Sequence, residues 1–516
     1  MLRTRSHARP LSSRSAKYLG GTPAQDLKNG KKRKLAHDDE EPEPKRTRVI
    51  VSNSVPLLRG ADAPTTLFVH GAGGSGQLGL GPEVMEDVGR PRLNTTFQRG
   101  IQTVACGGMH SLLIDGEGKL WSWGSNDDLA LGRPTEAIEG KDPDELEASP
   151  SLVEGLDDNF IAVGADAGDC MSVAIGSEGQ LRVWGTFRSE DGKSSFDGKQ
   201  KRTQTPQSYT ALSRHRICQV SCGGSHIIAL TTEGTVFTWG MGERGEIGRP
   251  ADNWTTALQP EALALGRITA ICAGSHQSFA VDAEGVVYAW GLNHMHQLGL
   301  GRDTPFIGLP TPIESLHPLY HNGAKVVSIS CGEFHTLFLF DNGELWACGR
   351  CDEDAIGLAP DHPSMTAVLK QHAEELPALK QRLASKTGTS LDDPQIANLK
   401  VDLHIRQPAR IAFPPPPSST DPAPPLPAYA AGFSSTRIRY ITTGPRYSLA
   451  CAEDGALYAW GVGTSAQLGL GANTETAATP TRVRSKALND YNAFEVAAGG
   501  QHVLVSASRM AELAAE

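Results

Sequence analysis

Histidine and cysteine recur in this sequence at spacings that invite comparison with a metal site or a thiol nucleophile. Five histidines end similar glycine-containing loops, at His110, His226, His276, His335 and His502. Four cysteines lie four residues before such a histidine, at Cys106, Cys222, Cys272 and Cys331. Imidazole and thiolate groups are common Zn²⁺ ligands, so the question is whether these side chains converge.

The pattern argues against convergence. Each histidine belongs to a different copy of a repeated unit, and separate units should hold the rings apart. No regular Asp or Glu accompanies them, although ligand histidines are normally oriented by such groups. We therefore interpret the histidines as structural and the cysteines as small buried strand residues. The Cys348-Gly-Arg-Cys351 spacing has no second pair and no βαβ context, so we interpret it as structural as well.

Other catalytic constellations are not found in the sequence. We identify no paired carboxylates, no nucleophile elbow and no metal-ligand spacing. An enzyme with a pocket in a central channel is therefore the weakest alternative. We expect no covalent chemistry, no metal and no cofactor.

The elements that carry these residues are copies of one unit, best seen in residues 107–132. The unit contains a Gly-Gly-x-His loop, an apolar run, an Asp/Gly turn, a second apolar run ending in Trp-Gly, and a polar loop closed by Leu-Gly. This pattern predicts a β-hairpin with a loop at each end. The second run ends at Gly71, Gly124, Gly185, Gly240, Gly291, Gly349 and Gly461. We place the opening loops at 107–110, 167–170, 223–226, 273–276, 332–335, 443–446 and 499–502.

Seven such units predict an all-β fold, a seven-bladed β-propeller. The chain begins with the late half of a unit (67–81) and ends with the early half (496–506), so we expect the terminal halves to share one blade. A third apolar segment opening with proline occurs in most units, as at Pro91, Pro310, Pro408 and Pro480. Because proline is tolerated on edge strands, these segments should be the outer strands. The tryptophans should fill the space between blades.

Composition limits the remaining possibilities. The chain has 516 residues, 39% of them hydrophobic, which suffices for a large core. It has no run of 18 apolar residues, so we predict no transmembrane helix and no membrane partner. The Arg- and Ser-rich start lacks the apolar region of a secretory signal, and a transit peptide over residues 1–20 is the alternative.

The first 60 residues differ in composition from the rest. Residues 1–48 contain 13 Lys and Arg but only 6 Asp and Glu, whereas the whole chain has 48 and 58. We predict a disordered basic tail over 1–60, before an acidic propeller over 61–510. Two basic clusters are typical of a nuclear import signal or of phosphate contacts with DNA: Lys31, Lys32, Arg33 and Lys34, then Lys45, Arg46 and Arg48. A merely solvated charged tail is the alternative.

Two segments depart from the repeat. The loop 187–196 is longer and more charged than its counterparts and should form a functional hairpin standing off one face, unless it is only a tolerated insertion. Residues 359–435 form an insertion within the propeller. Its first part has helical apolar spacing over 365–386 with a break at Pro377, its later part is proline-rich, and 408–413 should return as an outer strand.

The repeat signatures Gly-Gly-x-His and Trp-Gly…Gln-Leu-Gly resemble those of the regulator of chromosome condensation family, nuclear exchange factors for the small GTPase Ran. Three segments carry a narrower resemblance: 76–93 to the family's first blade, 123–133 to its second, and 184–192 to its third, which bears a β-wedge. The resemblance implies a nuclear protein that binds Ran with one propeller face. The wedge would press on the loop that cradles the nucleotide phosphates and would favour the empty GTPase.

The resemblance also implies site residues. Asp169 matches an acidic interface position, and the wedge supplies Phe187, Arg188, Glu190, Asp191 and Gly192. Further positions on the same face would be Asp128, Arg249, His296, Arg350 and His502. The tail would bind importin, and DNA or chromatin as well. The stretch 249–268, where the family has an Arg-rich nucleosome-contacting loop, is poor in basic residues here.

Two positions depart from the family's pattern. Ser225 stands where the family has an acidic residue, and Phe334 stands where it has a histidine. Both family residues are linked to exchange. The competing hypothesis is therefore a non-exchanging nuclear propeller scaffold that binds other proteins through the same face.

Overall fold

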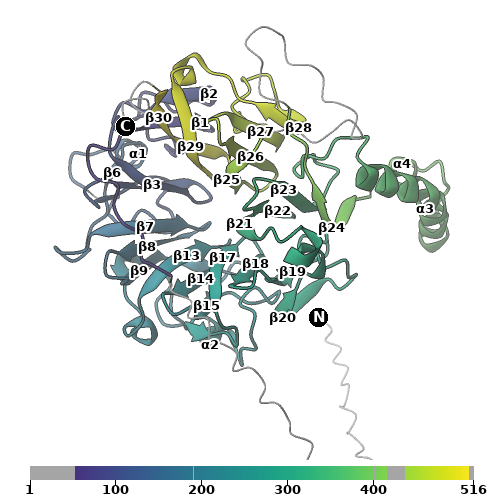
Figure 1. The fold of residues 1–516 in the computed structure, drawn as a ribbon, viewed down its shortest axis with the longest axis horizontal. Helices are drawn as coiled ribbons and strands as arrows, with labels where there is room; N and C mark the ends of the chain where they lie inside the picture. The colour runs from purple at the N-terminus through teal and green to yellow at the C-terminus, as the bar shows by residue number, and fades with distance from the viewer. Residues whose placement is uncertain (1–52, 137, 190, 400, 415–435, 511–516) are drawn as a thin grey trace, which may run out of the picture. The chain divides into compact units, whose positions relative to one another are not determined.

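The computed structural model describes residues 53–510, apart from 137, 190, 400 and 415–435. Among these residues, seven four-stranded antiparallel sheets form the blades of a propeller, and a two-stranded sheet is added to the third blade (Figure 1). The predicted fold class is therefore confirmed. The basic clusters of the predicted tail lie outside the described residues.

Blade 1 closes the ring with both ends of the propeller. It contains β29 (Tyr491–Ala498), β30 (His502–Arg509), β1 (Thr65–Gly71) and β2 (Val88–Leu93). Strand β1 pairs with β30 along its whole length, from Thr65 opposite Ser508 to Gly71 opposite His502. The predicted sharing of one blade by the two terminal halves is confirmed.

The other blades follow in chain order from the central channel outward. Blade 2 contains β3 (Ile101–Cys106), β4 (His110–Asp115), β5 (Leu120–Gly124) and β6 (Ser151–Leu152). Blade 3 contains β7 (Ala162–Ala167), β8 (Met171–Gly176), β9 (Leu181–Gly185) and β12 (Thr203–Gln207), with the hairpin β10 (Phe187–Arg188) and β11 (Ser194–Ser195) between the last two. Blade 4 contains β13 (Ile217–Cys222), β14 (His226–Thr231), β15 (Val236–Gly240) and β16 (Glu261–Ala262).

Blade 5 contains β17 (Ile268–Ala273), β18 (Gln277–Asp282), β19 (Val287–Leu292) and β20 (Phe306–Pro312). Blade 6 contains β21 (Val326–Cys331), β22 (His335–Phe340), β23 (Leu345–Arg350) and β24 (His404–Arg410). Blade 7 contains β25 (Ile438–Thr443), β26 (Tyr447–Ala452), β27 (Leu457–Val462) and β28 (Thr476–Arg482). The described helices are α1 (Pro143–Ala148), α2 (Trp254–Ala257), α3 (Pro363–Thr387) and α4 (Pro394–Ala397), with the short 3₁₀ turns Thr210–Leu212, Glu314–Leu316, Pro318–Tyr320 and Lys486–Leu488.

The position of each strand in its blade explains its composition. First strands line a central channel of about 440 Å³ and expose small or polar side chains to it. Second strands are covered on both faces by neighbouring blades, so β8, β14, β22 and β26 are buried at every residue and read as near-continuous apolar runs. Outer strands carry the prolines, as predicted: Pro91, Pro310, Pro408 and Pro480.

Strand pairing corrects the predicted loop position in three blades. In blade 2 the residue opposite the Trp-Gly glycine is His110, paired with Gly124. The residues paired with Gly185, Gly291 and Gly461 are Met171, Gln277 and Tyr447. The loops of blades 3, 5 and 7 therefore run over 168–171, 274–277 and 444–447, one residue later than expected. His276 consequently precedes the repeat position and does not occupy it.

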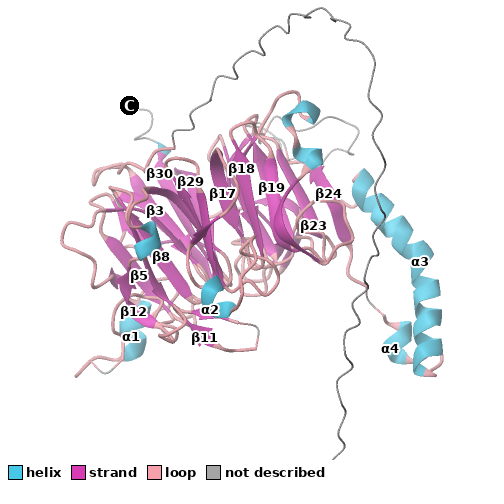
Figure 2. Cartoon of the chain, turned by 90° about the horizontal axis from the view of Figure 1, so that it is seen from below, coloured by secondary structure: helices cyan, strands magenta, loops and turns pink. Residues whose placement is uncertain are grey.

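The insertion adds a helical unit beside blade 6. Figure 2 shows α3 and α4 outside the sheets, beyond β24. Helix α3 is anchored at its start, where Met365 and Val368 pack against the apolar core of blades 6 and 7. It continues through Pro377, so the predicted break is wrong. Proline removes one backbone donor, and the Glu, Leu, Ala, Lys and Gln residues around it are strong helix formers. The predicted return over 408–413 is present as the end of β24 and the residues after it.

The described chain begins inside the segment predicted to be disordered. Asn53 donates its side-chain amide to the carbonyl of Ile268 at 2.9 Å, and the carbonyl of Leu57 accepts from Gln102 Nε2 at 2.9 Å. Val55 is buried in the core of blades 3 and 4. Arg59 lies 3.7 Å from Glu495 Oε2 in blade 1. Residues 53–60, which we name the strap, therefore contact blades 1 to 5 and belong with the propeller.

Candidate protein-interaction face

One end of every blade carries both loops of the repeat. Because the strands are antiparallel, the loop that joins the first and second strands and the loop that follows the third strand leave from the same end. We name this end of the propeller the rim face. The opposite end carries the tight Asp/Gly turns between second and third strands, such as 115–119.

The repeat histidines connect neighbouring blades below the rim face. His110 Nε2 lies 2.8 Å from Ser172 Oγ, and Ser172 Oγ donates to the carbonyl of Ala130 at 2.8 Å. The serine proton is thus used, so the imidazole Nε2–H donates to the serine. The same arrangement, which we name the His–Ser latch, occurs at His226–Ser278, His335–Ser448 and His502–Ser111.

Burial of these rings explains both the motif and its chemistry. A Cβ added at Gly223 would lie 2.2 Å from His226 Cε1, so the ring covers the loop glycine and only glycine fits. His502 is fully buried and occupied by its latch, so its predicted contact with a partner stays a prediction that this structure gives no exposed atom to support. Burial lowers the pKa of His110 to about 4 and that of His335 to about 3, so the latch histidines are neutral.

The tryptophans fill the seams between blades, as predicted. Trp184 Nε1 donates at 2.7 Å to the same carbonyl of Ala130 that accepts from Ser172. Trp123, Trp290 and Trp460 make the equivalent bonds to Gln77, Glu246 and Ala355. Each of these four seams thus combines a buried ring with a carbonyl that accepts two hydrogen bonds.

The seam between blades 3 and 4 is different and supports the predicted hairpin. Met171 replaces the latch histidine, and Ile227 replaces the latch serine. Phe187 and Phe196 enter this seam with ring centroids 6.4 Å apart, in the core that contains Met171 and Trp239. Phe187 is fully buried, so it anchors the hairpin and does not face a partner. Its role in partner binding and exchange stays a prediction, and the burial shows that any such role would act through the position of the hairpin.

The hairpin itself presents charged residues on the rim face. Arg188 pairs with Ser194, and its guanidinium binds both carboxylate oxygens of Asp128 at 2.8 Å. Asp191 and Lys193 form an exposed ion pair at the tip, with Gly192 at φ +81° between them. Both bonds to Asp128 come from the one nitrogen Nη2 of Arg188, and hydrogen bonds between charged groups are stronger than neutral ones. The hairpin is therefore held at its base by apolar packing and at its flank by Asp128. Glu190 lies outside the described residues.

A cavity of about 230 Å³ lies beside the hairpin. Its lining brings together Asp169, Arg188, Ser225, Glu246 and His276 from blades 3 to 5. The backbone N–H of Arg188 donates to Ser225 Oγ at 3.3 Å, and His276 Nδ1 lies 3.6 Å from Glu246 Oε1. The structure thus joins the predicted Asp169 and Arg188, and adds Glu246 and His276. The position of His276 in the opening loop of blade 5 could have identified it. The one-residue error in that loop made His276 look like a latch histidine instead.

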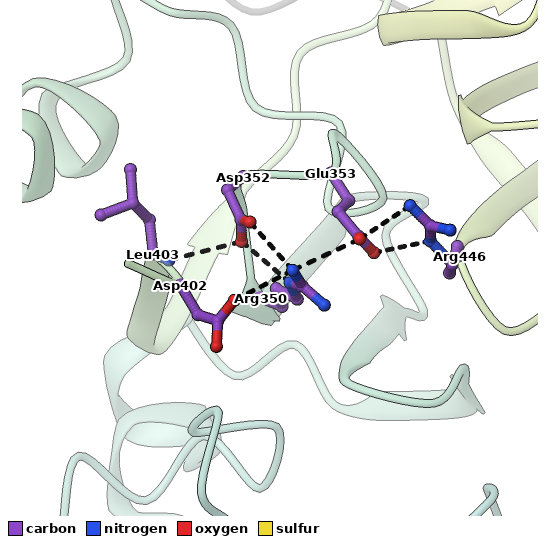
Figure 3. Close-up of polar contacts among 6 residues, drawn as sticks. All are labelled: Arg350, Asp352, Glu353, Asp402, Leu403 and Arg446. Carbon is purple, nitrogen blue, oxygen red and sulfur yellow. Dashed lines mark hydrogen bonds and ion pairs between the residues drawn. The ribbon is translucent and has the colours of Figure 1, made fainter. Parts of the chain in front are cut away.

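A second polar cluster occupies the rim of blades 6 and 7. Figure 3 shows Arg350 between Asp352, Glu353 and Asp402, with Glu353 also bound to Arg446. Arg350 Nη2 lies 3.0 Å from Asp402 Oδ1, and Asp402 comes from the return of the insertion. Glu353 accepts from Arg446 Nε at 2.8 Å. Arg350 therefore lies at the predicted face, but its charge is already compensated by three carboxylates.

Two other predicted contact residues, Arg249 and His296, are packed within the propeller. The Arg249 side chain is 8% exposed and clamps the outer edge of blade 4, with Nη1 at 2.9 Å from Glu261 and Nη2 donating to the carbonyl of Gln259 at 2.8 Å. His296 is buried, with its ring stacked on His404 at a centroid distance of 4.3 Å. Both side chains are thus engaged within the propeller in this structure, and their predicted contacts with a partner stay predictions.

Neither a metal centre nor a membrane-crossing helix is found among the described residues. No group of three His, Cys, Asp or Glu side chains among them is arranged to bind a metal ion. No helix in the described part of the chain is long and apolar enough to cross a membrane. The rim face carries the hairpin, the cavity beside it and the ion-paired arginines Arg188 and Arg350, and is the candidate surface for a protein partner.

A closed seven-bladed propeller with such a face defines a class of interaction proteins. The RCC1-like domain matches residues 66–505, so the chain belongs to this family. Protein pim1 of Schizosaccharomyces pombe is 33% identical over 498 residues, which cover 93% of this chain and 81% of pim1. The guanine nucleotide exchange factor SRM1 of Saccharomyces cerevisiae is 30% identical over 480 residues, which cover 88% and 89% of the two chains.

Solved structures agree with this assignment. The crystal structure of Prp20p from Saccharomyces cerevisiae, studied with its binding properties to Gsp1p and histones, has a TM-score of 0.69 at 28% identity and covers 90% of this chain and 95% of its own. Yeast RCC1 (Prp20) bound to Kap60 has a TM-score of 0.70 at 27% identity and covers 94% and 99%.

Proposed function

We propose that this chain is a guanine nucleotide exchange factor for the small GTPase Ran and acts without covalent chemistry. Family membership and the similarity to SRM1 support the activity. The observation that carries the proposal is the hairpin of blade 3, which is fixed at its base by Phe187 and at its flank by the Arg188–Asp128 pair. A rigid projection of this kind displaces a partner's loop instead of yielding to it.

The exchange mechanism follows from differential binding. The nucleotide phosphates in a small GTPase are held by backbone N–H groups and a lysine. The hairpin tip, with Asp191 and Gly192, presses on that loop and lowers nucleotide affinity. The cavity beside it, with Asp169 and His276, binds the emptied partner. Exchange results because the factor binds the empty state better than the loaded state.

The basic tail supports a nuclear location. We propose that its clusters at 31–34 and 45–48 bind importin, and that the same charges contact DNA or chromatin. The similarity to yeast RCC1 bound to Kap60 supports the first role, and the similarity to Prp20p supports the second.

Release of fluorescent GDP from purified Ran tests the proposal. The sharpest variant replaces residues 189–193 with Asn-Gly, a turn that joins Arg188 to Ser194 and keeps both buried phenylalanines. We expect catalytic amounts of the unmodified chain to accelerate release, and the tip variant to lose about 100-fold or more of that acceleration, since the effect depends on one positioned contact. Glu117→Ala, in the exposed turn at the opposite end of blade 2, is the matched control.

The second candidate function is a non-exchanging scaffold. It is favoured by Phe334, whose ring packs edge-on to His294 at a centroid distance of 5.2 Å on the rim face. It is also favoured by Ser225, which adds no charge to the cavity. Under this alternative Ran or another partner would be captured by the immobilised chain, and GDP release would stay at its spontaneous rate.

A further inference from the structure

Two free thiols from different blades meet at the wall of the central channel. Cys272 is the penultimate residue of β17, the inner strand of blade 5. Cys331 is the last residue of β21, the inner strand of blade 6. Their Sγ atoms are 3.4 Å apart, and both residues line the channel. The other seven cysteines are also free. This thiol contact joins residues 59 positions apart in the sequence.

The backbones around the pair are held close by other contacts. A Cβ added at Gly274 would lie 2.4 Å from the Cβ of Cys331, so the two blades approach without an intervening side chain. Gln277 Nε2 donates to the carbonyl of Gly332 at 2.9 Å across the same seam. These contacts fix the sulfur atoms relative to each other without requiring a covalent bond.

We propose that Cys272 and Cys331 form an oxidant-sensitive thiol pair, which a small hydroperoxide converts to a disulfide between blades 5 and 6. The observation that carries the proposal is the contact of the two sulfurs in residues that line the channel, where Cys272 is buried and Cys331 is half-buried. A small and polar oxidant can enter this channel, whose lining is mainly glycine, serine and threonine with a few isoleucines.

The reaction balances with the peroxide as the only oxidant. One thiolate attacks a peroxide oxygen, breaks the O–O bond and becomes a sulfenic acid, and the hydroxide that leaves is protonated to water. The second sulfur then attacks the sulfenic sulfur, forms the S–S bond and releases a second water. Two thiols and one hydrogen peroxide thus give one disulfide and two waters.

The surroundings set the rate and the selectivity. Burial raises the pKa of Cys331, so little thiolate is present at neutral pH and the first step is slow. The second step is fast because the partner sulfur is already in contact. Cys106 occupies the same position in blade 2, but its Sγ lies 3.4 Å from the carbonyl of Ala497. Its sulfenic acid would have no thiol to condense with at that contact.

Peptide mapping of the full chain tests the proposal. The protein is treated with hydrogen peroxide, its remaining thiols are alkylated, and it is digested without reductant. We expect a linked peptide that contains Cys272 and Cys331, lighter than its two parts by two hydrogens, and its loss after reduction. Cys272→Ser and Cys331→Ser should each remove it, whereas Cys106→Ser should leave its yield unchanged.

The competing partner is Cys348, a buried thiol of the same blade that adds to the raised pKa of Cys331. A Cys331–Cys348 linkage, or a Cys272–Cys331 linkage found only after the chain is unfolded, would overturn the proposal. So would accumulation of sulfinic acid at Cys331 with no linked peptide. Because the mapping is done on the unsubstituted protein, the result does not depend on whether a serine variant folds.

Discussion

At the scale of single residues, the latch histidine is a buried neutral base whose protonation opposes folding. Burial lowers the pKa of His226 to about 4 and that of His502 to about 3, against about 6.5 in an unfolded chain. Between pH 6.5 and about 4 the unfolded state therefore binds more protons than the folded state. The protein therefore loses stability as the pH falls through this window. Above pH 6.5 these histidines do not make its stability depend on pH.

This loss of stability on acidification predicts the effect of His335→Gln. Glutamine occupies the equivalent position in blade 5, where Gln277 donates across the seam, so the substitution fits. We expect a loss of about 1–2 kcal/mol at pH 7.5 from the weaker latch. We also expect a shallower decline between pH 6.5 and 4, by up to about 1.4 kcal/mol per pH unit. Urea unfolding across this range measures both, with His372→Gln on α3 as the control for losing a histidine away from the seams. An unchanged slope would contradict the assignment.

At the scale of elements, the hairpin contains residues of two kinds: buried residues that stabilise the fold, and exposed residues that lie on the rim face. Phe187→Ala removes a fully buried ring from the seam of blades 3 and 4, so we expect a loss of about 3–5 kcal/mol. Asp191→Ala removes the exposed pair with Lys193 and the bond accepted from Ser189 Oγ, both within the tip, and should change the unfolding midpoint far less than Phe187→Ala does. Urea unfolding of both variants, beside their GDP release, separates the two roles. Equal destabilisation by both would show that the tip is part of the fold.

The same element shows what sequence reasoning can and cannot reach. The repeat spacing predicted the blades, the shared closing blade and the hairpin, because each depends on local patterns of period two and on turns. It misplaced three loops because Met171, Gln277 and Tyr447 replace histidine, while Cys170, His276 and Arg446 precede them and complete a similar-looking motif. The burial of Arg249 and His296 depends on Glu261 and on His404 from the insertion. Such tertiary partners leave no local signal.

At the scale of the whole molecule, two sets of contacts hold the ring of blades together. The hydrogen bonds of β1 and β30 join its ends, and the strap contacts five blades on the side away from the rim face. The strap's Leu58 packs against the cores on both sides of blade 3, and Arg59 approaches Glu495. Burial raises the pKa of Glu495, which indicates that its carboxylate depends on neighbours such as Arg59 and Thr103.

The strap predicts a difference between two truncated chains. A chain that begins at residue 53 keeps Asn53, Val55 and Arg59 in place, whereas one that begins at residue 61 loses them. Because the strap buries Val55, and burial of one aliphatic side chain contributes about 1.5–3 kcal/mol, and because Asn53 and Leu57 add hydrogen bonds to the propeller, we expect the shorter chain to be the less stable of the two. Thermal unfolding compares the two. Glu495→Gln in the shorter chain should recover part of the loss, since it removes the buried charge that Arg59 no longer compensates. Equal midpoints for the two chains would mean that β1 and β30 alone close the ring.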